Sequence, residues 1–88
     1  MNILLIEDNQ AIAKNISQYL ALNHITVTHC ADGVQGLEYA LKGQYDLILL
    51  DVMLPGMDGI QVCQKVRAQR DTPILMVTSK GQLEDKLQ

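Results

Sequence analysis

Three acidic residues stand directly after short apolar runs in this sequence. Glu7 and Asp8 follow the run at residues 3–6, and Asp51 follows the run at residues 47–50. Each run is typical of a strand that is buried on both faces of a sheet. Because the carboxyl ends of neighbouring parallel strands meet at one edge of a sheet, we expect the three carboxylates to lie within a few ångströms of one another.

Taken singly, an acid at a strand end is most often a solvated turn residue, but the three together point to a metal. Carboxylates this close repel one another, and the repulsion raises the pKa of at least one of them. A divalent cation removes the repulsion, and Mg²⁺ binds one or two carboxylates together with water and phosphate oxygens. The acids therefore predict a Mg²⁺ site, and the hydroxyls of Thr78 and Ser79, which follow a fourth apolar run, are expected at the same edge.

The rest of the chain alternates between strand and helix patterns. Apolar residues recur at helical spacing after Asn9, Asp32 and Asp58, and all three are residue types that cap helix N-termini. Strands are expected at residues 3–6, 25–29, 47–50 and 74–77, and helices at residues 9–20, 32–43, 58–66 and 82–87. This alternation with short connections predicts an α/β fold, in which helices cover both faces of a parallel sheet.

Length and composition narrow the possible functions. The 88 residues allow a single domain, residues 1–88, and an apolar content of 48% excludes disorder. A net charge of −3 without a basic stripe argues against nucleic-acid binding by this chain, and no apolar stretch is long enough to span a membrane. Cys30 and Cys63 lack metal-ligand spacing, which favours a reduced, cytoplasmic setting. His24 and His29 are expected at the surface, away from the acidic edge.

The sequence resembles the receiver domain of bacterial two-component response regulators. The resemblance covers the whole chain, and its matching stretches are residues 3–8, 46–59 and 73–79, of which residues 50–59 are the most specific. It implies a flavodoxin-like or CheY-like doubly wound parallel sheet with strand order 2-1-3-4. Receiver domains continue through a fifth strand and a fifth helix, and the resemblance therefore implies a truncated receiver domain that lacks this unit.

The resemblance also implies a role for each acid. Asp51 corresponds to the phosphoacceptor, which receives a phosphoryl group from a histidine kinase. Glu7, Asp8, the Asp51 carboxylate and the backbone carbonyl of Met53 correspond to the Mg²⁺ ligands, and Thr78 corresponds to the hydroxyl that senses phosphorylation. Physical chemistry agrees with these roles, because an aspartate can attack a phosphoryl group and a cation can align the reactants. The output domain, outside this chain, is expected to regulate transcription by binding DNA.

The missing fifth unit has consequences. It carries a lysine of the phosphoryl site, and Lys80 is expected to be solvated and not to replace that lysine. Its absence leaves the uncharged strand at residues 74–77 as a sheet edge and uncovers apolar surface beside the first helix. We therefore expect homo-oligomers formed through the fourth strand, the fourth helix or an exchange of elements.

Two other functions compete with the receiver. An aspartate-nucleophile phosphohydrolase also uses Mg²⁺, but it typically needs an acid two residues after the nucleophile, and this chain has Met53 there. The domain is therefore not expected to be a dedicated enzyme. The second competitor is a structural or assembly fragment that binds a divalent cation and self-associates without being phosphorylated.

Overall fold

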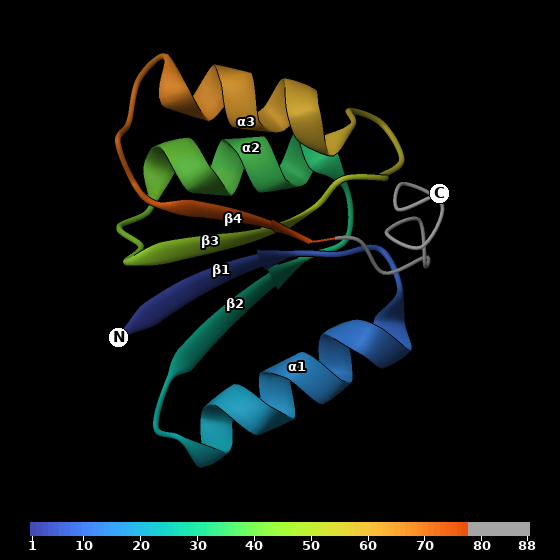
Figure 1. Ribbon diagram of the computed structural model, residues 1–88, viewed down its shortest axis with the longest axis vertical. Coiled ribbons are helices and arrows are strands. Elements are labelled where there is room, and N and C mark those ends of the chain that lie inside the picture. The colour runs from blue at the N-terminus through green and yellow to red at the C-terminus, as the bar shows by residue number, and fades with distance from the viewer. Residues whose placement is uncertain (78–88) are drawn as a thin grey trace, which may run out of the picture.

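The structure, a computed structural model, describes residues 1–77. Its strands are β1 (Asn2–Ile6), β2 (Thr26–Cys30), β3 (Leu47–Asp51) and β4 (Ile74–Val77), and its helices are α1 (Gln10–Leu22), α2 (Gly33–Lys42) and α3 (Gly59–Arg67) (Figure 1). The expected helix at residues 82–87 and the expected roles of Thr78, Ser79 and Lys80 lie outside the described residues. Within residues 1–77, none of the helices has the length and apolar character needed to cross a bilayer.

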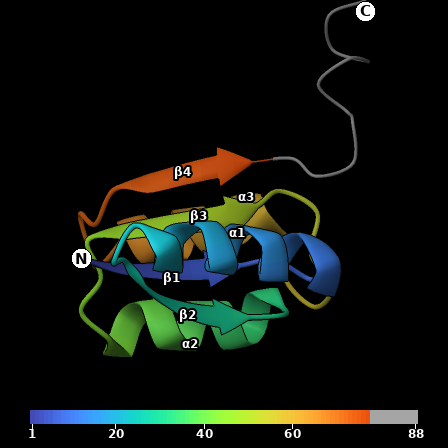
Figure 2. The same cartoon turned by 90° about the horizontal axis from the view of Figure 1, so that it is seen from below.

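The strands form one parallel sheet in the order β2-β1-β3-β4, as predicted. Helix α1 lies on one side of the sheet, and α2 and α3 lie side by side on the other (Figures 1 and 2). Central β1 pairs Ile6 with Cys30 of β2 and with Leu50 of β3, so these strands end at the same edge. The α/β fold with helices on both faces is thereby confirmed.

The main core lies between the sheet and the helices α2 and α3. Alternate residues of β1 and β3 point to this side because side chains of a strand alternate between its two faces. The buried members of the core are Leu4, Ile6, Cys30, Ala40, Ile48, Leu50, Val62 and Val66. The opposite face of β1 is also buried, and the strand is therefore apolar from Ile3 to Ile6, as the run at residues 3–6 predicts.

Each helix begins at its predicted capping residue. The side chains of Asn9, Asp32 and Asp58 accept hydrogen bonds from backbone N–H groups in the first turns of α1, α2 and α3. Gln61 completes a capping box with Asp58, which satisfies two backbone donors at the start of α3. These caps set the points at which the chain turns from the carboxyl edge of the sheet into each helix.

The second strand is shifted by one residue from its predicted position. Ile25 is not part of β2, because its N–H donates to the carbonyl of Leu20 at the end of α1. At its other end, β2 runs to Cys30, which pairs with Ile6 of β1. His29 therefore lies next to the carboxyl end of β2.

Candidate metal and phosphoacceptor site

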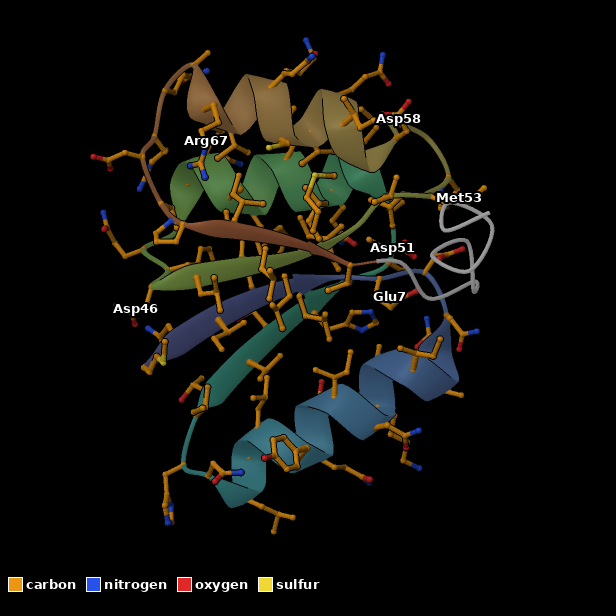
Figure 3. The ribbon with its side chains drawn as sticks, viewed as in Figure 1. Glu7, Asp46, Asp51, Met53, Asp58 and Arg67 are labelled. Atoms are coloured by element: carbon orange, nitrogen blue, oxygen red, sulfur yellow. The ribbon has the colours of Figure 1, made fainter. Side chains whose placement is uncertain are left out.

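Three carboxylates from two strands converge at the carboxyl edge of the sheet. Glu7 and Asp8 follow β1 directly, and Asp51 is the last residue of the neighbouring strand β3. One carboxylate oxygen from each residue lies within 4.8 Å of the other two. Figure 3 shows Glu7 and Asp51 beside each other at this edge. The structure therefore brings together the three carboxylates that the sequence places at strand ends.

Two of the three acids are buried and Asp8 is half-buried, and this burial controls the protonation of Glu7. Both Glu7 and Asp51 have no solvent-exposed surface. The pKa of Glu7 is raised from 4.5 to about 7, mainly because burial removes the hydration of the charged form and also because the Asp51 and Asp8 carboxylates lie nearby. A hydrogen bond from the Asn9 N–H, 3.0 Å from Glu7 Oε2, partly opposes this rise. Without a cation, the cluster therefore holds a proton near neutral pH.

Two oxygens of the cluster are buried without a hydrogen-bond partner among residues 1–77. They are Glu7 Oε1 and Asp8 Oδ1. Buried polar atoms are nearly always paired, because an unpaired one loses its hydration without compensation. A hard cation with oxygen ligands would satisfy both atoms and neutralise the charge of the cluster. The chemistry and spacing of these residues thus fit a divalent metal.

The loop between β3 and α3 holds Asp51 in place. The Met53 N–H donates to Asp51 Oδ1 at 3.1 Å, and the Gly59 N–H donates to the Val52 carbonyl at 2.9 Å. Gly56 adopts φ 81°, a conformation open to glycine, so the turn after Pro55 requires a positive φ. The role of the Met53 carbonyl as a metal ligand stays a prediction.

A glycine allows close packing under the same loop. A Cβ at Gly59 would collide with the backbone carbonyl of Asp51 and lie 2.8 Å from Val52 Cα. The start of α3 can therefore approach the end of β3 only because position 59 lacks a side chain. Beside this contact, a hollow of about 500 Å³ is lined by Val52, Met53, Leu54, Asp58 and Ile60.

The expected position of His29 is wrong in one respect. Its side chain is exposed, as predicted, but it is not remote from the acidic edge, because Nε2 lies 2.7 Å from the Glu7 carbonyl oxygen. The signal that could have found it is the strand register, which sets His29 beside β1 near the end where Glu7 follows. His24 is exposed and lies at the opposite end of β2, as expected.

Comparison with known proteins identifies the family. The protein-family model described as the response regulator receiver domain matches residues 3–88 of this chain. The chain is 41% identical over 85 residues to the response regulator ArlR of Staphylococcus aureus strain Mu50, and the match covers 97% of this chain and 39% of ArlR. The chain thus spans about two fifths of the length of that relative.

Solved structures agree with this match. The receiver domain of the sensor histidine kinase PA1611 from Pseudomonas aeruginosa PAO1, crystallised with a magnesium ion coordinated in its active-site cleft, superposes with a TM-score of 0.84 at 36% identity. The aligned region covers 94% of this chain and 73% of that one.

A second structure is the complex of histidine kinase ThkA with response regulator protein TrrA. A chain of this complex superposes with a TM-score of 0.83 at 26% identity, over 89% of this chain and 68% of that one. The family match, the curated relative and the common fold lead to one conclusion. The chain belongs to the receiver domain family of two-component response regulators, a family of signalling modules.

Proposed function

We propose that Asp51 accepts a phosphoryl group from a histidine kinase while Glu7, Asp8, Asp51 and the Met53 carbonyl hold Mg²⁺. The observation that carries this proposal is the cluster of two buried acids and one half-buried acid, in which one oxygen of each carboxylate lies within 4.8 Å of the others. The unpaired oxygens of Glu7 and Asp8 support a cation, because such an ion would satisfy both. The magnesium ion bound by the PA1611 receiver domain supports the choice of metal.

In the proposed reaction, a carboxylate oxygen of Asp51 forms a bond to phosphorus. At the same time, the bond between phosphorus and a ring nitrogen of the kinase histidine breaks. Bound Mg²⁺ supplies charge neutralisation between the carboxylates and the phosphoryl oxygens. The chain itself aligns the nucleophile, because the Met53 N–H holds Asp51 Oδ1 and β3 holds the backbone of Asp51.

A histidine kinase is the proposed partner. The ThkA–TrrA complex supports this assignment, because a similar chain in that structure is bound in a complex with a kinase. We propose that the domain acts as a switch and not as a dedicated enzyme, because Met53 takes the position where a phosphohydrolase would need an acid. A cytoplasmic location is also proposed, and it is supported by Cys30 and Cys63, which are both free thiols.

The output is also a proposal. The length of ArlR relative to this chain supports a separate output domain, for which transcriptional control through DNA is proposed. The net charge of −3 supports the view that residues 1–88 do not themselves bind nucleic acid. That residues 1–88 form a single domain stays a prediction.

The 88-residue chain is further proposed to self-associate through β4. Among residues 1–77, β4 pairs only with β3, its sequence is uncharged, and Leu75 is 54% exposed. An open, apolar strand edge is a template for pairing with a second strand. This property supports the assembly function as a second candidate, and it is compatible with phosphorylation of Asp51.

Chemical phosphorylation tests the main proposal. Incubation with acetyl phosphate and Mg²⁺ is expected to add one labile phosphoryl group, seen by intact mass spectrometry. Asp51→Asn should abolish the adduct, because the amide is not a nucleophile of the same kind. Asp58→Asn is the matched control and should keep the adduct, since asparagine also caps α3. An adduct that persists in Asp51→Asn, or no adduct in the wild type, would overturn the proposal.

A further inference from the structure

One contact links the second strand to the loop that carries two of the acids. His29 Nε2 lies 2.7 Å from the carbonyl oxygen of Glu7, which is 22 positions earlier in the chain. We infer that His29 is a positioning residue that sets the geometry of the Glu7 and Asp8 carboxylates for cation binding. The inference rests on the proposed function, since it assigns a role toward the same cation.

The contact extends the hydrogen bonding of the sheet beyond the end of β1. The regular pairing of β1 with β2 ends at Ile6 and Cys30. The Glu7 N–H then donates to the Cys30 carbonyl at 3.0 Å, and the Glu7 carbonyl accepts from His29 Nε2. Both backbone polar groups of Glu7 are therefore bound to β2, although Glu7 lies outside the strand.

The second of these bonds restrains the peptide unit between the two acids. A carbonyl oxygen and the following amide nitrogen share one rigid plane, so fixing the Glu7 carbonyl fixes the orientation of the amide of Asp8. The directions in which the side chains of Glu7 and Asp8 leave the backbone depend on that plane. His29 thereby acts on the cluster through the backbone, without touching a carboxylate.

A restraint on the backbone is needed because the carboxylates of Glu7, Asp8 and Asp51 repel one another. The Asp51 and Asp8 charges raise the pKa of Glu7, which is the electrostatic sign of this repulsion. Residues that follow a strand in a loop would relax away from one another unless the backbone is held. Holding them in advance lowers the cost of collecting the ligands when the cation binds.

The chemistry of the pair defines what a replacement must supply. A carbonyl oxygen only accepts, so His29 Nε2 carries the proton and donates. Glutamine presents an amide N–H at similar reach and can donate in its place, whereas leucine fills similar space with no donor. The two variants therefore separate the hydrogen bond from packing.

Direct cation binding tests the inference. Titration calorimetry of the wild-type protein with MgCl₂ alone is compared with His29→Leu and His29→Gln. We expect His29→Leu to weaken Mg²⁺ affinity about 10-fold, the size of effect seen when groups that orient metal ligands are removed. His29→Gln should restore affinity to within about 3-fold of the wild type. The melting temperature without Mg²⁺ should differ little between the two variants.

His24→Asn removes the other imidazole at the far end of β2 and tolerates the local φ of 63°, so it should leave Mg²⁺ affinity unchanged. Wild-type affinity in His29→Leu, or an equal loss in His29→Gln and His29→Leu, overturns the positioning role even if Asp51 is phosphorylated. A selective loss in His29→Leu with no phosphoryl adduct on wild-type Asp51 supports the positioning role and overturns the proposed phosphorylation alone.

Discussion

Glu7 is the residue of the acidic cluster whose burial raises its pKa. It is fully buried beside two other carboxylates, and its pKa rises to about 7, mainly through burial. A protonated carboxyl carries no charge and therefore does not repel the neighbouring carboxylates. It also binds a cation more weakly than the ionised carboxylate does. The proton and the cation therefore compete for Glu7, and this competition makes stability and Mg²⁺ affinity depend on pH.

The first prediction concerns stability without metal. Between pH 4.5 and about 7, the folded protein keeps a proton on Glu7 that the unfolded chain has lost. The folded state binds more protons in this window, so the free energy of unfolding should fall as pH rises through it, by on the order of 3 kcal/mol. Glu7→Gln removes this titration, and its stability relative to the wild type should grow over the same window. Urea unfolding at several pH values measures the difference.

Addition of Mg²⁺ gives the complementary result. The cation favours the ionised carboxyl, and its stabilising effect on the wild type should therefore be larger at pH 8 than at pH 5. Glu7→Gln should show a much smaller effect of Mg²⁺ at both pH values. Parallel changes in the free energy of unfolding of the wild type and Glu7→Gln from pH 4.5 to 7, measured without Mg²⁺, would contradict a proton held on Glu7.

At the scale of the elements, the junction between β3 and α3 sets the position of the phosphoacceptor. Asp51 ends the strand, the loop returns through a turn with positive φ at Gly56, and α3 starts at Gly59 against the Asp51 carbonyl. A hydrogen bond from the Gly59 N–H to the Val52 carbonyl links the start of α3 to the end of β3. The packing of this helix start is therefore part of what holds Asp51.

The second prediction tests this junction. Gly59→Ala places a Cβ against the backbone of Asp51 and Val52, and backbone atoms cannot move aside as a flexible side chain could. We expect a loss of about 1–3 kcal/mol in the free energy of unfolding, the range typical of overpacking. Gln64→Ala, at an exposed position of the same helix, should change stability by less than about 0.5 kcal/mol. Equal stability of the two variants in urea unfolding would contradict the packing argument.

At the scale of the whole molecule, the sheet is covered unevenly by residues 1–77. Helices α2 and α3 cover one face, and α1 alone lies on the other (Figures 1 and 2). Ile74 and Met76 pack on the core beneath α2 and α3, so Leu75 points to the face that carries α1, where it is 54% exposed. Within residues 1–77, strand β4 thus has an edge that pairs with no further strand, together with exposed apolar surface.

The third prediction concerns association of the 88-residue chain. Light scattering is expected to detect a mass above that of the monomer, increasing with protein concentration. Leu75→Lys should shift the chain toward the monomer, because a charge on an edge strand opposes pairing. Ile60→Lys is the matched control, since Ile60 is equally exposed at 54% but lies on α3, and it should leave association unchanged. A monodisperse wild-type monomer at high concentration would rule out the proposed edge.

Much of the fold could be predicted from local patterns. Apolar runs and helical spacing indicate the strands and helices, and Asn9, Asp32 and Asp58 mark the helix starts, because caps depend on residues only a few positions apart. The boundary of β2 could not be predicted to the residue, because the Ile25 N–H pairs with Leu20 and not with a strand. Whether a residue continues a helix end or begins a strand depends on such competing hydrogen bonds.

Local sequence patterns place Glu7 and Asp8 after β1 and Asp51 at the end of β3, and they predict that these strands lie in a parallel sheet. The folded molecule adds the carboxylate oxygens that are buried without partners among residues 1–77, the rise in the pKa of Glu7, and the hydrogen bond from His29 to the Glu7 carbonyl. The reason is physical: periodicity and capping depend on near neighbours in the chain. Burial, charge repulsion and bonds between strands depend on distances that exist only after the sheet has formed.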